Sequence, residues 1–100
     1  MDLEQEGLLM FFKPWQLKCM NTLWSRNESI TSREVWEPLK TEISRASVIN
    51  FLEDMVENNI LIRSETTGKG GHRGLYKPAY TEAETKQYIK KMFREKLDHL

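Results

Sequence analysis

The chain has 100 residues, of which 39% are hydrophobic and 30% are charged. This composition predicts one small globular domain and excludes a disordered tail. The longest uninterrupted apolar run extends only from Leu8 to Phe12, which is too short to span a membrane. The acidic beginning is unlike a signal peptide, and the single cysteine, Cys19, cannot form an internal disulfide. We therefore expect a cytoplasmic protein.

Charge is unevenly distributed along the chain, although 15 basic and 15 acidic residues balance to a net charge of zero. Residues 1–12 carry acidic side chains and no basic one. In residues 63–80 the balance is reversed, with Arg63, Lys69, Arg73 and Lys77 against Glu65. A protein needs positive charge only where it meets phosphate, so the neutral total does not exclude a nucleic-acid partner.

Three helices are predicted in the first part of the chain, and the first begins near Pro14, since proline suits the first helical position. Apolar residues then recur at helical spacing until residues 25–27. The pair Thr31 and Glu34 is a T-x-x-E capping box that opens a second helix, which Pro38 should end early. Capping residues also mark both ends of the third helix, which begins at Ser44 and ends at Asn59.

A hairpin and a last helix complete the expected fold. Strands are predicted at residues 60–65 and 75–80, joined by a glycine-rich loop at residues 66–74. Another T-x-x-E box, beginning at Thr81, opens a last helix over residues 82–98. Four helices and one hairpin give a mainly α fold with a small β-hairpin. This order is typical of a winged helix-turn-helix followed by a C-terminal helix.

The expected organisation is one domain with two extensions. Residues 1–12 form an N-terminal arm, and residues 13–80 form the winged helix-turn-helix, which we expect to bind DNA. Residues 81–100 form a C-terminal helix that we expect to mediate dimerisation.

The third helix has the pattern of a DNA-recognition helix. Its apolar residues fall on one side, and a 100° step per residue places Ala46 and Asn50 on the opposite face. An asparagine can make a bidentate contact with adenine, while Arg45 and Ser47 lie beside it in the first turn. Phosphate would repel the acidic residues farther along the helix, so we expect only its N-terminal half to approach DNA. The alternative is an ordinary surface helix with an arginine near its start.

The hairpin tip combines glycines with basic or titratable side chains, namely Lys69, His72 and Arg73. Glycine permits the positive φ of a tight turn and exposes backbone N–H groups, so this tip suits phosphate or minor-groove contact. A solvated turn without a function is the alternative. A phosphate-cradling nucleotide loop is not expected, because the sequence GxxxxGK[ST] is absent.

The last helix carries a narrow apolar stripe that resembles a coiled-coil seam. The stripe is formed by Ile89, Met92, Phe93, Leu97 and Leu100. Together with the apolar end of the arm it predicts a homodimer, which would present two recognition helices to a palindromic site. Alternatively, the last helix folds back onto its own chain.

Residues capable of catalysis or metal binding are few and scattered. The histidines His72 and His99 and the cysteine Cys19 do not have the spacing of a zinc site. No catalytic motif or pair of carboxylates in a pocket is recognisable. We therefore expect neither an enzyme nor a metal or other cofactor. Nothing in the sequence identifies a small-molecule effector.

Residues 13–80 resemble the penicillinase-repressor family, whose members control beta-lactamase, methicillin-resistance and copper-transport genes. The resemblance rests on PWQLKCMNTLW, ITSREVWEPL, SRASVINFLEDMVENNILIR and GHRGLYKPAY. It implies a winged-helix dimer that represses by occupying operator DNA. Family members have a longer C-terminal helical part, and Asn59 replaces their usual glycine.

The sequence thus predicts a sequence-specific transcriptional regulator, a homodimeric repressor that binds double-stranded DNA. The expected DNA contacts are Thr31, Ser32, Ser44, Arg45, Ala46, Ser47, Asn50, Lys69, His72 and Arg73. The alternative function is a winged helix that binds another protein and not DNA.

Overall fold

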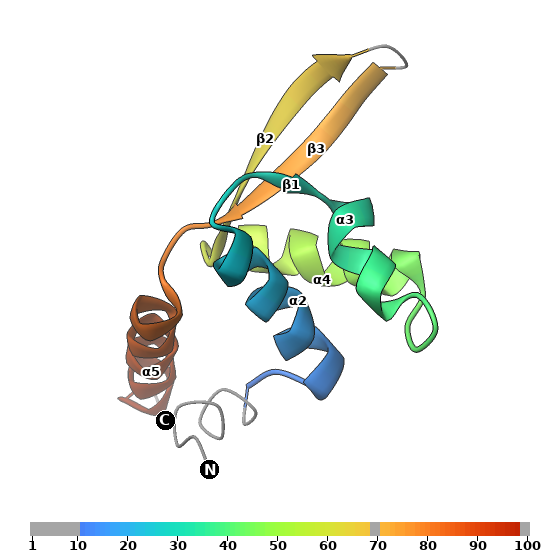
Figure 1. Cartoon of the computed structure of the whole chain (residues 1–100). Coiled ribbons are helices and arrows are strands. Elements are labelled where there is room, and N and C mark those ends of the chain that lie inside the picture. The colour runs from blue at the N-terminus through green and yellow to red at the C-terminus, as the bar shows by residue number, and fades with distance from the viewer. Residues whose placement is uncertain (1–10, 69–70, 99–100) are drawn as a thin grey trace.

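The computed structural model describes residues 11–68 and 71–98, which form a helical body, a projecting hairpin and a C-terminal helix (Figure 1). The elements in chain order are α2 (Pro14–Arg26), β1 (Ile30–Thr31), α3 (Ser32–Trp36), the 3-10 helix η1 (Glu37–Leu39), α4 (Arg45–Glu57), β2 (Leu61–Gly68), β3 (Gly71–Pro78) and α5 (Glu82–Asp98). The predicted fold class, a winged helix-turn-helix followed by a C-terminal helix, is confirmed.

Helix boundaries follow the capping residues that the sequence offers. Thr31 and Glu34 form the expected reciprocal box, with Glu34 N–H donating to the Thr31 hydroxyl at 3.2 Å. Ser44 caps α4 through its hydroxyl, which accepts from the Ser47 N–H. Asn27 and Asn59 adopt the left-handed conformation just beyond α2 and α4, with φ values of 49° and 64°. These short polar side chains tolerate positive φ better than others, so they end helices where glycine is absent.

Proline ends the α-helical part of the second helix, as expected. The α-helix stops at Trp36, and the chain continues for one turn as η1, which contains Pro38. The missing N–H and the crowding of the preceding residue disfavour another α-helical turn, whereas a 3-10 turn accommodates the ring.

The sheet differs from the prediction in two respects. First, the short strand β1 was not predicted, and it pairs with β3 through Ile30 opposite Tyr76 to give the order β1-β3-β2. Second, most of the expected loop at residues 66–74 is strand. Thr66 and Thr67 pair with Arg73 and His72, because continuing the ladder satisfies backbone N–H and C=O groups that a long loop would leave to water.

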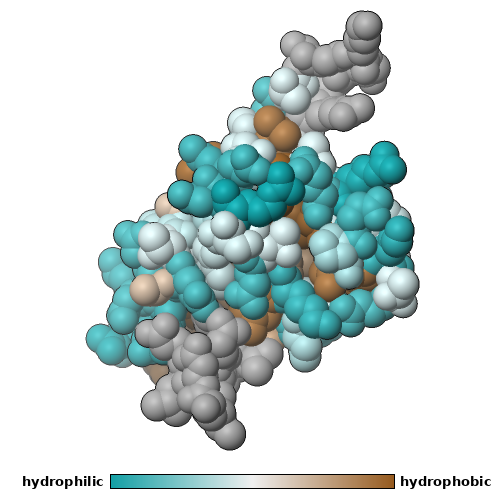
Figure 2. Space-filling view, in the orientation of Figure 1, coloured by the Kyte–Doolittle hydropathy of each residue, from teal (hydrophilic) through white to brown (hydrophobic). Residues whose placement is uncertain are grey.

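The core lies between α2, α3, α4 and the base of the sheet. Met20, Leu23, Val48 and Leu52 are completely buried there. Cys19 is buried beside them, and this burial raises the pKa of its thiol to about 12. The cysteine therefore acts as a small apolar residue. On the face shown in Figure 2 the described surface is mostly hydrophilic, with small hydrophobic patches.

Helix α5 stands beside the helical body and is joined to β3 by residues 79–81 (Figure 1). Thr85 and Ile89 are buried against the rest of the chain. The Tyr88 hydroxyl donates to the carbonyl oxygen of Asn58 at 3.0 Å. The start of α5 therefore folds back onto its own chain at the end of α4.

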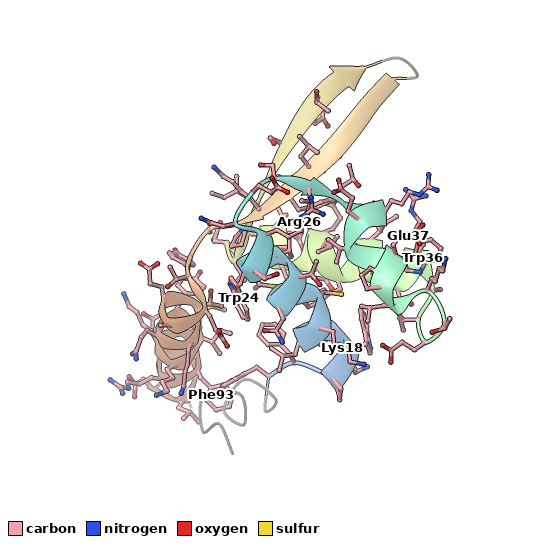
Figure 3. The ribbon with its side chains drawn as sticks, in the orientation of Figure 1. Lys18, Trp24, Arg26, Trp36, Glu37 and Phe93 are labelled. Atoms are coloured by element: carbon pink, nitrogen blue, oxygen red, sulfur yellow. The ribbon has the colours of Figure 1, made fainter. Side chains whose placement is uncertain are left out.

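Two half-buried tryptophans, Trp24 and Trp36, differ in how they are held (Figure 3). Trp36 Nε1 donates to the carbonyl oxygen of Ile43 at 2.9 Å and so connects α3 to the turn before α4. Trp24 Nε1 is buried and has no hydrogen-bond partner among the described residues. Trp24 is thus held by packing alone.

Replacing each tryptophan with phenylalanine separates packing from hydrogen bonding. Trp36→Phe leaves the Ile43 carbonyl without its donor, so it should lower the free energy of unfolding by about 1 kcal/mol more than Trp24→Phe does. Urea unfolding of both variants beside the unmodified protein measures the difference. Equal losses in the two variants would contradict the contribution assigned to the Trp36 bond.

Candidate nucleic-acid interface

The first turns of α4 present an exposed and unpaired polar surface. Arg45, Ala46 and Asn50 are all exposed. Neither Arg45 nor Asn50 has an ion pair or hydrogen bond with another described residue. Buried Val48 and Leu52 on the opposite side hold the helix to the core, so this face points to solvent. The surface offers donors and an amide in the arrangement that the sequence predicted.

Hydroxyl groups that were predicted to contact DNA are used in helix capping instead. The Ser44 hydroxyl accepts from Ser47 N–H at 3.2 Å and lies 2.9 Å from the Ser47 hydroxyl. The Thr31 hydroxyl bonds with Glu34, and half-buried Ser32 is the first residue of α3. These residues shape the starts of the two helices.

The hairpin of β2 and β3, called the wing below, projects from the helical body (Figure 1). His72 and Arg73 belong to β3, and their backbones pair with Thr67 and Thr66. Lys69, the third predicted wing contact, lies outside the described residues. Lys77, farther along β3, is exposed.

Glu53 connects α4 to the wing. The hydroxyl of Tyr76 on β3 donates to its carboxylate at 2.5 Å, and Arg63 on β2 lies 3.3 Å from the same oxygen. Arg63 also pairs with Glu65 at 3.0 Å. Because the Tyr76 ring is buried, desolvation, followed by its bond to Glu53, raises the pKa of the phenol above its ordinary 10.0. We call these four residues the wing bridge: Glu53, Arg63, Glu65 and Tyr76.

Gly74 gives the Arg63 guanidinium its space across the wing. A Cβ at Gly74 would come within 3.0 Å of Arg63 Nε and Nη2. The side chain of Arg63 therefore lies over the neighbouring strand at this glycine, where it can reach both carboxylates of the wing bridge. A larger residue at position 74 would displace the guanidinium.

The wing bridge was missed in the sequence analysis, which counted Arg63 among the basic residues available to a partner. Its charge is instead opposed by Glu53 and Glu65. The ion pair between Arg63 and Glu65 was predictable, because residues two apart lie on the same face of a strand. The contribution of Glu53 could not be foreseen, since it depends on how α4 packs against the sheet.

The apolar stripe predicted on the last helix is divided between core and surface. Ile89 is buried in its own chain, and Met92 is half-buried. Phe93 and Leu97 are 53% and 56% exposed. The ring of Phe11, itself 39% exposed, meets Phe93 edge-on with centroids 5.4 Å apart. Leu100 lies outside the described residues.

Neither a metal cluster nor a membrane-spanning helix is found in the described part of the chain. Among residues 11–68 and 71–98, no group of three histidines, cysteines or acidic residues could hold a metal ion. Within the same ranges, no helix is both long enough and apolar enough to cross a bilayer.

Comparison with known proteins adds a likeness in fold. No family model and no curated protein matches the chain. A solved structure from Methanosarcina mazei Go1, of a protein named as a possible transcriptional regulator, superimposes with a TM-score of 0.73. The alignment covers 95% of this chain and 80% of that one at 19% sequence identity. At this identity, the likeness shows a shared fold.

Removing the Tyr76 hydroxyl tests the wing bridge. Tyr76→Phe keeps the buried ring but loses the bond to Glu53, so the free energy of unfolding should fall by about 1 kcal/mol at pH 7. The raised pKa keeps the folded phenol protonated, so its contribution is complete below pH 10 and is lost as the pH rises through the folded pKa. The difference in stability between the two proteins should therefore narrow above pH 10.

Denaturant unfolding between pH 7 and pH 11 measures this effect. The control is Tyr80→Phe at pH 7, since the Tyr80 hydroxyl has no hydrogen bond to another described residue. That variant should change the free energy of unfolding by less than about 0.5 kcal/mol. A difference between the unmodified protein and Tyr76→Phe that stays constant with pH would contradict the account.

Proposed function

We propose that the chain is a sequence-specific DNA-binding transcriptional regulator that acts as a homodimeric repressor on a palindromic operator. The observation that carries the proposal is the start of α4, where Arg45 and Asn50 are exposed and without partners among the described residues. Asn50 would read adenine in the major groove, and Arg45 would contact a neighbouring base. Ala46 would let the helix lie close to the groove floor.

Acidic residues on α4 limit which part of the helix can approach DNA. Exposed Asp54 and Glu57 lie in its C-terminal half and would be repelled by phosphate. Glu53 lies closer to the proposed contacts, but its charge is opposed by Arg63 in the wing bridge. The electrostatics therefore favour an approach by the N-terminal half of α4, where the helix dipole is also positive.

The wing would supply contacts to the sugar-phosphate backbone in this proposal. Lys69, His72 and Arg73 would meet phosphates or the minor groove beside the major-groove site. Thr31, Ser32, Ser44 and Ser47 would add contacts at the two helix starts. Such contacts fix orientation and raise affinity without distinguishing sequences.

A likeness in fold supports a regulatory role, and a resemblance in sequence is the basis on which repression is proposed. The Methanosarcina mazei protein with the same fold is named as a possible transcriptional regulator. The motifs over residues 13–80 resemble those of the penicillinase-repressor family, which implies repression by operator occupancy. We propose this role for the present chain on the strength of both likenesses.

A second copy of the chain is the proposed partner of the exposed apolar surface on α5. Phe93 and Leu97 are more than half exposed, and Phe11 extends the same surface. Burial of such side chains between two copies is favourable, and a two-fold pair would place two α4 helices for a palindromic site.

Substitutions in helix and wing should weaken DNA binding in different ways. Asn50→Ala should cost about 1–3 kcal/mol on the preferred site and little on random duplex, because it removes a base contact. Lys69→Ala should weaken both duplexes similarly and lower the salt slope by about 0.9 for each phosphate that is no longer neutralised. The measurement is a binding titration at several salt concentrations, with the preferred site first selected from random duplexes.

Lys91→Ala is the control for these titrations, since this exposed lysine lies on α5. Its affinity and salt slope should equal those of the unmodified protein. Equal losses for the helix and wing variants on both duplexes would contradict the division of roles. Binding without salt dependence, or no binding, would favour the protein-interaction function.

Charged substitutions on α5 test the proposed dimer. Phe93→Asp combined with Leu97→Asp should give a folded monomer, because a buried unpaired carboxylate is strongly unfavourable. Sedimentation of both proteins at tens of micromolar measures the change, with circular dichroism to verify folding. A monomeric unmodified protein, or a dimer that survives both substitutions, would exclude this interface.

A further inference from the structure

Basic side chains form a row along one side of α5. Lys86, Lys90 and Arg94 follow one another at intervals of four residues. They therefore lie on the same side of the helix, about 6 Å apart along its axis. Lys91 flanks them and, like Lys90 and Arg94, is exposed. We call these four residues the basic row. In Figure 3, several nitrogen-tipped side chains of α5 point away from the helical body.

The basic row has no carboxylate partners, unlike many bases of the helical body and the wing. There, ion pairs are formed by Lys18, Arg26, Arg33, Lys40 and Arg63. Within residues 11–68 and 71–98, no ion pair joins a member of the basic row to another side chain. Asp98 follows Arg94 by one turn, but the two are not paired. The positive charge of the row is thus left uncompensated by the described chain.

Repulsion within the basic row makes this lack of partners costly. Residues four apart on a helix are neighbours, and like charges at that spacing destabilise it. Lys86 repels Lys90, and Lys90 repels Arg94, so the repulsion continues along two turns. An anionic segment lying along the row would replace this repulsion with attraction.

The N-terminal arm, residues 1–12, carries the opposite charge. Asp2, Glu4 and Glu6 belong to it, and it contains no lysine or arginine. Residues 1–10 lie outside the described ranges, but the point at which they join the described chain is known. There, the ring of Phe11 meets that of Phe93 with centroids 5.4 Å apart. The arm therefore joins the described chain at α5, next to the residue that precedes Arg94.

The length of the arm suits the length of the basic row. The three acidic residues precede Phe11 by five to nine positions. Five residues extend over at most about 17 Å, whereas the row from Lys86 to Arg94 is about 12 Å long. Every base in the row is thus within reach of an acidic side chain of the arm.

We propose that the acidic part of the arm, residues 2–6, docks on the basic row of its own chain. The link through Phe11 keeps this segment close to α5, which gives it a high effective concentration there. The basic row of a second copy would instead repel the first. The start of α5 is not the expected site, since Glu84 would repel the arm. This docking does not depend on the proposed binding to DNA or on the proposed dimer.

A nitroxide spin label on the arm tests the proposal. Gln5→Cys provides its attachment, while Cys19 should stay unlabelled, because burial raises the pKa of its thiol to about 12. In nitrogen-15 NMR spectra of the full chain, the label should broaden the backbone N–H signals of residues 86–94. Lys90→Glu combined with Arg94→Glu should reduce this broadening several-fold. Glu4→Lys combined with Glu6→Lys should do the same without altering α5.

Combining all four charge reversals should restore the broadening, because the two charged segments attract each other again. The matched control is Arg45→Glu with Lys77→Glu, which reverses two exposed bases elsewhere and should leave the broadening unchanged. Circular dichroism verifies that each variant is folded. Broadening that persists in both reversed pairs, or that their combination does not restore, would overturn the proposal.

A mixed sample distinguishes the arm of the same chain from that of a second copy. Protein labelled with nitrogen-15 but without nitroxide is mixed with unlabelled protein that carries the nitroxide. Docking within one chain predicts no broadening of residues 86–94 in this mixture. Broadening as strong as in the singly prepared protein would assign the basic row to the arm of a second copy and overturn the proposal.

Discussion

Tyr76 is the point at which the helical core, the sheet and the wing are joined. Its ring is buried, and its backbone lies in the central strand opposite both Ile30 and Arg63. Its hydroxyl reaches Glu53 on α4. The direction of the wing relative to α4 therefore depends on this side chain, together with Arg63, which reaches the same carboxylate. The proposed binding to DNA requires that relation to be fixed, because the helix and the wing would contact one duplex together.

The wing bridge also changes the electrostatics of the proposed interface. Four basic residues lie between positions 63 and 80, and one of them, Arg63, is paired with two carboxylates. Pairing it with Glu53 opposes an acidic charge that lies one turn from Asn50. One arginine is thus used to hold the wing in place and to reduce repulsion near the start of α4, instead of contacting a partner directly.

Helix α5 has two different surroundings along its length. In its first half, the Tyr88 hydroxyl bonds to the end of α4 and Ile89 is buried. Its second half exposes Phe93 and Leu97. The surface proposed for dimerisation therefore lies on the second half of the helix.

Local sequence determined the ends of the helices and their order. Capping residues such as Thr31 and Ser44 act through atoms three residues away, so short-range pattern is enough to locate them. The buried face of α4 was equally predictable from the helical spacing of its apolar residues. These features are what made the winged helix recognisable without a structure.

Tertiary structure decided the contacts between residues far apart in the chain. Strand β1 is too short to have a pattern of its own and exists because β3 offers it an edge. The strands continue past Glu65 because each pairs with the other. Glu53 and Arg63 meet only after α4 and the hairpin have packed. Such contacts depend on how the elements pack in three dimensions, which periodicity along the chain does not encode.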